Sequence, residues 1–248
     1  MQDALILTGI ATLTVLATGL GAIPVMLLGA RAEALRPVLS GVAMGVMGVA
    51  AVVGLLIPAV KEGTPAQVAG GIVLGAGGLF WAGRALRRRL GDTSTGKADR
   101  AAWLTFGVLF VHSLPEGLAI GSAYAASGSL GTFVIIAIAV QNIPEGTATA
   151  IALRQAGRSG LRQFEAAVLS SVPQIPGALV AWAAVDAVNG LLPVSFAAAG
   201  AAMFLLVTTE LAPEAWRDGG RMWAVAGTLA GAAAMLLLAV VLAPDAGL

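Results

Sequence analysis

The stretch WLTFGVLFVHSLPEGLAIGSAYAASGSLGTFVIIAIAVQNIPEGTATAIAL, residues 103–153, contains two apolar runs joined by a short turn sequence around Gly128. Each run is long enough for the roughly 20 residues that a helix needs to cross about 30 Å of hydrocarbon. Because the connection is so short, the two runs predict an antiparallel hairpin of membrane helices over 103–126 and 130–153.

The rest of the chain is as apolar as this hairpin. Of its 248 residues 58% are hydrophobic and 11% charged, and the mean hydropathy is +0.91. A soluble domain has about 25% charged residues, so a water-soluble globule is excluded. The apolar runs are continuous rather than alternating, which favours helices over a β-barrel. We expect an all-α integral membrane protein, one domain over 1–248, with eight transmembrane helices over 4–30, 38–60, 67–83, 103–126, 130–153, 163–185, 193–213 and 222–243.

The cationic residues lie on one side of this topology. The odd-numbered connections contain every Lys and Arg except Lys61. Since these residues accumulate in short cytoplasmic loops, both termini should lie outside the cytoplasm, in a multi-pass protein of the cell membrane. The longest connection, 84–102, is expected to be a cytoplasmic loop, either a plain connection or a contact for anionic lipids. The net charge of +1 excludes a basic nucleic-acid-binding protein.

The hairpin carries one polar hexapeptide twice, as HSLPEG at 112–117 and QNIPEG at 141–146. In each copy a helix places the first residue and the glutamate on one face, so His112 lies beside Glu116 and Gln141 beside Glu145. At about 1.5 Å per residue both pairs fall near the middle of the membrane. Ionisable residues at that depth are candidates for function.

The proline and glycine of each hexapeptide add a prediction about the backbone. Pro115 and Pro144 each remove a backbone donor, so a loosened turn is expected beside each glutamate. Gly117 and Gly146 should allow a neighbouring helix to approach closely.

Two glutamates in the membrane need a counter-charge that the chain does not provide. The predicted spans contain no Lys or Arg, and His112 is the only histidine. A divalent cation would balance the carboxylates, with imidazole and amide oxygen as further ligands. A structural hydrogen bond would explain a single His–Glu pair equally well, but the duplication favours a metal site. Without a His-Glu-x-x-His motif or a second histidine, we expect no enzyme.

These two helices resemble the signature helices of the ZIP family of divalent metal transporters, in particular its bacterial GufA-like branch. The similarity includes ATGLGAIP at 17–24, GVM at 45–47, LLIPA at 55–59 and ELAPE at 210–214. The resemblance implies an eight-helix homodimeric transporter that moves metal into the cytoplasm by alternating access. Helices one, four, five and six would move against the other four. A selective metal channel and a non-transporting membrane metal sensor or scaffold remain alternatives.

The resemblance also implies ligands. The central site would consist of His112, Glu116, Gln141 and Glu145, with Met47 as a weaker ligand whose other interpretation is packing. Zn²⁺ is expected on family grounds as the transported ion rather than a resident cofactor, although nitrogen and oxygen ligands with a methionine also suit Cd²⁺, Fe²⁺, Mn²⁺ and Co²⁺. Because the ligands must be deprotonated, affinity should fall as the pH falls.

Several relatives have a second metal position beside the first. Its places here are Ser113, Asn142 and Gln174, and because none carries a charge, we expect one metal ion per protomer. Glu210 and Glu214 lie near the predicted cytoplasmic end of helix seven, where they belong either to an exit funnel or to a solvated helix end.

Overall fold

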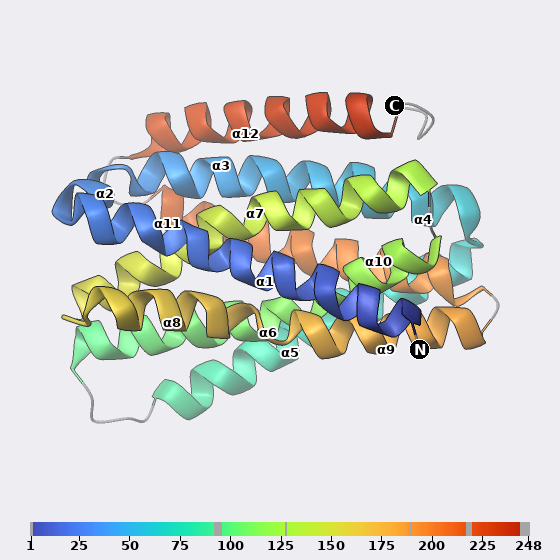
Figure 1. Ribbon diagram of the computed structural model, residues 1–248, viewed down its shortest axis with the longest axis horizontal. Coiled ribbons are helices and arrows are strands. Elements are labelled where there is room, and N and C mark those ends of the chain that lie inside the picture. Colours follow the sequence, from blue (N-terminus) through green and yellow to red (C-terminus); the bar gives the residue numbers. More distant parts are fainter. Residues whose placement is uncertain (1, 92–95, 127, 189, 217–219, 244–248) are drawn as a thin grey trace.

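The structure, a computed structural model, describes residues 2–91, 96–126, 128–188, 190–216 and 220–243. Its described residues form helices and no strand. Eight helical spans are long and apolar enough to cross a membrane, and they run side by side in one bundle (Figure 1). The predicted fold class is therefore confirmed. The spans are Gln2–Leu28, Arg36–Glu62, Pro65–Arg89, Ala98–Ala126, Gly128–Gln155, Gly160–Ala187, Leu191–Leu211 and Arg221–Leu242.

Within the described ranges, some spans are single helices and others are interrupted. The single helices are α1 (Gln2–Leu28), α5 (Pro65–Gly91), α6 (Lys97–Ala126), α7 (Gly128–Gln155) and α12 (Arg221–Leu242). The second span comprises α3 (Arg36–Val49), the π-helix η1 (Ala50–Leu56) and α4 (Ile57–Glu62), and the short α2 (Ala30–Ala34) precedes it. The sixth comprises α8 (Gly160–Ser171) and α9 (Gln174–Ala187). The seventh comprises α10 (Leu191–Leu206) and the π-helix η2 (Val207–Leu211), followed by α11 (Ala212–Ala215).

Two local expectations differ from the structure. The loop predicted over 84–102 is shorter, because α5 continues to Gly91 and α6 begins at Lys97. The added turns are rich in Arg, Leu and Ala, which favour helices, and their arginines can extend to the membrane surface. At Pro115 and Pro144 no interruption occurs, since α6 and α7 continue through both prolines. The π-helical turns lie instead in η1 and η2.

The two described ends of the chain lie at the same end of the bundle, on opposite sides of it (Figure 1). The opposite end, called here the arginine-rich end, is formed by the last turns of α1, α5 and α7 and the first turns of α3, α6, α8 and α12. Its described cationic residues include Arg31, Arg36, Arg84, Arg87, Arg88, Arg89, Arg100, Arg154, Arg158, Arg162 and Arg221.

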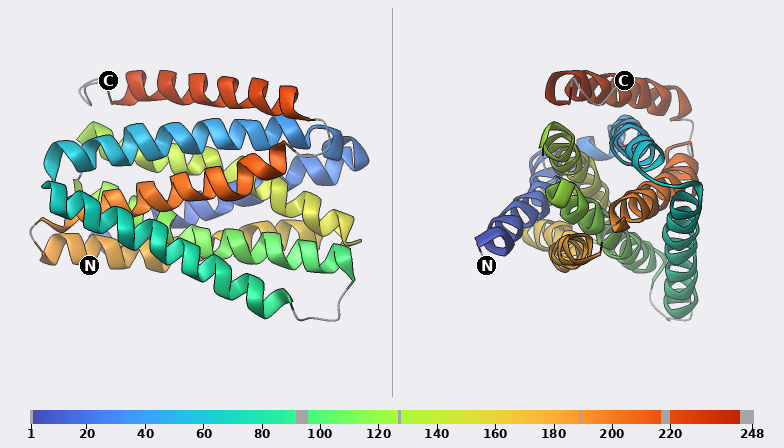
Figure 2. Two further views of the ribbon diagram at one scale, coloured as in Figure 1. Left: turned by 180° about the vertical axis from the view of Figure 1, so that it is seen from behind. Right: turned by 90° about the vertical axis from the view of Figure 1, so that its right-hand side faces the viewer.

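The helices differ in how much of them the bundle buries. In the most apolar part of each span, 61% of the residues of the α7 span are buried, but only 6% for α5 and 22% for α12. α5 packs on α10 and α12 packs on α3, both at the outside of the bundle (Figure 2). Their exposed side chains, such as Val73, Trp81, Leu229 and Leu237, are apolar. Such an apolar exterior requires a lipid environment, so the chain is a multi-pass membrane protein.

Candidate metal centre

The two hexapeptides meet inside the bundle. α6 and α7 are neighbours, and they bury His112, Glu116, Gln141 and Glu145, none of which is more than 2% exposed. One ligand atom each from His112, Glu116 and Glu145 lies within 4.8 Å of the others. The structure therefore brings together the residues that the repeat suggested, with both carboxylates and the imidazole around one point.

Several buried atoms at this point have no hydrogen-bond partner in the structure. They are Nδ1 and Nε2 of His112, Oε1 of Gln141 and Oε1 of Glu145. Buried polar atoms are nearly always paired, and one left without a partner costs about 1–3 kcal/mol. Imidazole nitrogen, amide oxygen and carboxylate oxygen all donate an electron pair, which is the chemistry of a transition-metal ligand. The donor set fits a divalent metal ion.

Charge leads to the same conclusion. Two buried carboxylates, those of Glu116 and Glu145, contribute up to two negative charges. α7 contains no cationic residue before Arg154, and α6 contains none after Arg100. A buried charge without a partner is strongly unfavourable, so a bound dication would neutralise the site.

Glu116 is held by two amides. The Gln141 side chain donates to its Oε1, and Gln174 Nε2 donates to its Oε2 over 2.7 Å. His112 Nε2 lies 3.7 Å from Oε1. The carboxylate is thus oriented by α7 and α9 together, with the imidazole beside one oxygen.

Gln174 and Asn142, two of the three residues at the expected second metal position, bond to each other. Each amide nitrogen donates to the oxygen of the other over 3.2 Å. Thr14 of α1 adds two bonds, because its hydroxyl donates to Gln174 Oε1 and its carbonyl accepts from Asn142 Nδ2, both over 2.7 Å. The third residue, Ser113, donates to the carbonyls of Leu109 and Ser170, each 2.9 Å away. These polar groups connect α1, α6, α7, α8 and α9.

The motif glycines are needed for this packing. A Cβ on Gly117 would lie 2.4 Å from the carbonyl oxygen of Gln174, and a Cβ on Gly146 would lie 1.7 Å from that of Thr18. Any larger side chain would push α9 away from α6, or α1 away from α7. The predicted close approach of neighbouring backbones occurs at both glycines.

The other predicted site residues belong to different helices, α3 for Met47 and η2 for Glu210. Met47 is fully buried on α3, which packs against α7. Glu210 lies in η2, where the guanidinium of Arg87 on α5 donates to both of its carboxylate oxygens. The side chain of Glu214 lies outside the described part of the structure.

A cavity connects the cluster with the arginine-rich end. It has a volume of about 400 Å³, and its lining includes Glu145 and Ala152 of α7, Arg36 of α3, Arg87 of α5 and Glu210 of η2. We call this cavity the vestibule.

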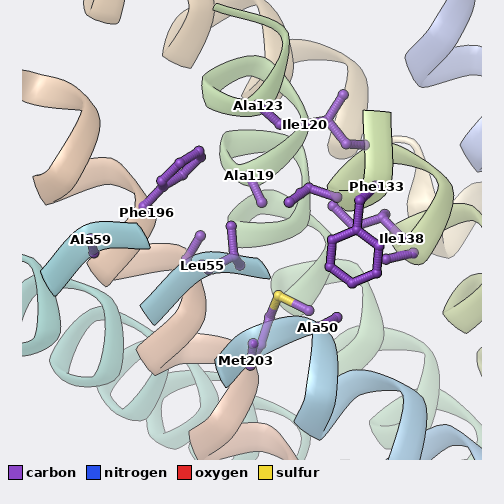
Figure 3. Packing of buried hydrophobic residues seen from close by; sticks show 14 of the residues in the cluster. Ala50, Leu55, Ala59, Ala119, Ile120, Ala123, Phe133, Ile138, Phe196 and Met203 are labelled. Carbon is purple, nitrogen blue, oxygen red and sulfur yellow. The ribbon is translucent and has the colours of Figure 1, made fainter. Parts of the chain in front are cut away.

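Toward the other end the bundle is closed. Leu55, Phe133, Ile138 and Phe196 pack there in an apolar cluster (Figure 3), and none of these side chains is more than 1% exposed. Among the residues that the structure describes, the cluster of His112, Glu116 and Glu145 is therefore connected by a cavity to the arginine-rich end alone.

Sequence patterns did not indicate two of these features. Thr14 and Thr18 are four residues apart in a mostly apolar helix, a spacing that could have marked a polar face of α1. The Arg87–Glu210 pair joins two helices that are distant in sequence, and only the tertiary structure reveals it.

Comparison with known proteins shows which family has a sequence similar to this chain. The sequence model of the ZIP zinc transporter family matches residues 89–239. The chain is 34% identical to the zinc transporter GufA of Myxococcus xanthus over 86% of this chain and 89% of that protein. It is 40% identical to the zinc transporter ZIPB of Bordetella bronchiseptica over 52% of this chain and 42% of that protein. A protein of Arabidopsis thaliana named as a zinc transporter is 30% identical over 82% of this chain, which spans only 33% of the plant protein.

Proposed function

This chain belongs to the ZIP zinc transporter family, and we propose that it moves a divalent transition metal, Zn²⁺ first, into the cytoplasm through a site formed by His112, Glu116, Gln141 and Glu145. The observation that carries the proposal is the set of buried donor atoms without partners beside two carboxylates. A purely structural His–Glu pair would not explain why ligand atoms of His112, Glu116 and Glu145 lie within 4.8 Å of one another. Met47 would complete the coordination as a weak ligand from α3.

The hydrogen bonds around Gln174 support a single ion per protomer. Oε2 of Glu116 already accepts from the Gln174 amide, so the second side of this carboxylate is occupied by a neutral donor. Asn142 and Gln174 also hydrogen-bond to each other through both amides. A second dication there would have to break these bonds without gaining a negative charge.

The arrangement of the helices favours a carrier over a channel. Buried hydrogen bonds join Thr14 to Gln174, Thr18 to Ser171 and Thr147 to Gly21, so they link α1, α7, α8 and α9 into one block. α6 joins this block through Glu116 and Ser113. The four central ligands all belong to it, whereas α5 and α12 pack on α10 and α3. A metal site carried by this block can move relative to a second block of α3, α5, α10 and α12.

The distribution of charge suggests the direction. Cationic loops are retained on the cytoplasmic side of membranes, which makes the arginine-rich end cytoplasmic and both termini extracytoplasmic. The vestibule opens from Glu145 toward that end, so the structure corresponds to a state poised for release into the cytoplasm. The homodimer implied by the resemblance is part of the same proposal.

Proteoliposomes containing the purified protein test this function. We expect saturable entry of Zn²⁺, with Cd²⁺, Fe²⁺ and Mn²⁺ compared in parallel, and complete loss of entry in His112→Ala and Glu145→Ala. Glu62→Ala is the matched control, because Glu62 is exposed at the end opposite the vestibule. Flux that does not saturate would favour a channel, and site-dependent binding without flux would favour a sensor or scaffold.

A further inference from the structure

The mouth of the vestibule contains an ion pair that the proposed metal site does not explain. Nη2 of Arg87 on α5 donates to both carboxylate oxygens of Glu210 in η2. The side chains are 50% and 31% exposed, so neither is enclosed by the bundle. Both residues line the vestibule, whose inner part is lined by Glu145.

The segment that carries Glu210 is specialised. π-helical turns are rare and often occur at functional sites. The hydroxyls of the neighbouring Thr208 and Thr209 donate back to carbonyls of their own helix. Glu210 is the group of this segment that interacts with a charge on another helix.

A dication leaving Glu145 for the arginine-rich end passes these charges. The ionisable residues lining the vestibule in the described structure are Arg36, Arg87, Glu145 and Glu210. If Glu210 were unpaired, it would attract and retain a passing dication, and an unpaired Arg87 would repel it. Paired guanidinium and carboxylate largely cancel each other's field, so this pair is neither a trap nor a barrier for the ion.

We propose that Arg87 is a positioning residue for metal release, which keeps the Glu210 carboxylate paired and the mouth of the vestibule electrically balanced. The inference rests on the proposed function, because it concerns the path by which the ion leaves the central site. Its distinctive consequence is that either charge alone is harmful to transport while the loss of both together is tolerated.

Four variants in the full chain test this consequence: Arg87→Gln, Glu210→Gln, the double variant and Arg89→Gln. Arg89 is exposed on the same helix end and does not line the vestibule, so its substitution removes an equal charge elsewhere. Initial rates of Zn²⁺ uptake into proteoliposomes should fall at least about threefold in each of the first two variants, because each leaves one charge unbalanced. The uptake rate of the double variant should recover to within about twofold of the wild-type rate, and Arg89→Gln should have the wild-type rate.

A second measurement separates this role from a merely structural one. Equilibrium dialysis with Cd²⁺ should show additional ion retained by Arg87→Gln, and the double variant should lose it. All variants should keep the thermal unfolding midpoint of the wild type, since an ion pair that the bundle does not enclose contributes little to stability. Uptake by Arg87→Gln at the wild-type rate, or a double variant as slow as the single ones, would overturn the inference. If the wild type itself takes up no metal, the proposed function fails instead.

Discussion

At the scale of single residues, neutral amides surround one carboxylate and leave the other with a free oxygen. Glu116 accepts from Gln141 and Gln174, whereas Glu145 Oε1 has no partner in the structure. The difference assigns distinct tasks to the two glutamates in our proposal. Glu116 is the preoriented ligand, and Glu145, which also lines the vestibule, is the ligand from which the ion departs.

Replacing the amide of Gln174 by a carboxylate tests the single-ion proposal. Gln174→Glu removes the donor to Glu116 Oε2 and adds a negative charge beside it, which creates two carboxylates able to share a second dication. We expect the number of Zn²⁺ ions bound per protomer at saturation to rise from one to about two. Equilibrium dialysis with elemental analysis measures this number, with Gln2→Glu as an exposed control. A variant that still binds one ion would contradict the proposal.

The same ligands predict the pH dependence of binding. Metal can bind only to deprotonated glutamates and a neutral imidazole, so acid competes with the ion. Zn²⁺ affinity should therefore fall as the pH falls, and binding should release protons. Calorimetric titration in two buffers with different ionisation enthalpies detects the released protons. Equal apparent enthalpies in both buffers would show that no proton leaves.

At the scale of helices, two glycines decide how closely the helices that hold the site approach each other. Gly146 lies against the carbonyl of Thr18, and Gly117 against that of Gln174. These contacts allow Thr14, Asn142 and Gln174 to reach one another. The hexapeptides thus provide both the ligands and the space for the helices that support them.

Gly146→Ala should therefore separate α1 from α7. Its Cβ would lie 1.7 Å from the Thr18 carbonyl oxygen, which only a backbone shift can relieve, and overpacking of this kind costs about 1–3 kcal/mol or more. We expect a lower unfolding temperature and weaker Zn²⁺ binding. Gly77→Ala is the matched control, because a Cβ there has no neighbour within 4 Å. That variant should be neutral or more stable by about 0.5–1 kcal/mol.

Much of this level of structure could be predicted from the sequence. The apolar runs give the number of spans, since hydropathy and length suffice for it, and the spacing within each hexapeptide places His112 and Glu116 on one face. The rotation of each helix about its axis depends on its neighbours. For that reason the sequence did not predict that Thr14 would reach Asn142, or that Arg87 would pair with Glu210. The π-helical turns likewise occur in η1 and η2 rather than at Pro115 and Pro144.

At the scale of the whole molecule, the site is open on one side. The vestibule leads to the arginine-rich end, and the cluster around Phe133 and Phe196 closes the other. A carrier must expose its site alternately to the two sides, so this arrangement represents one of its two states in our proposal.

Because the chain has no cysteine, single cysteines can report this accessibility. Ala152→Cys, in the wall of the vestibule, should react with a membrane-impermeant maleimide added from the cytoplasmic side of membrane vesicles. Ala123→Cys, fully buried in the apolar cluster, should remain unlabelled from either side when metal is absent. Labelling of Ala152→Cys only from the outside would reverse the proposed orientation.

The most direct test of the central claim is anomalous diffraction at the zinc edge from crystals of the Zn²⁺-loaded protein. Our account predicts one strong peak per protomer inside the bundle, at about 2.0–2.2 Å from a His112 nitrogen and from oxygens of Glu116 and Glu145. Gln141 Oε1 should be in contact with the same ion. Peaks confined to the protein surface, or two peaks of equal height flanking Glu116, would contradict it.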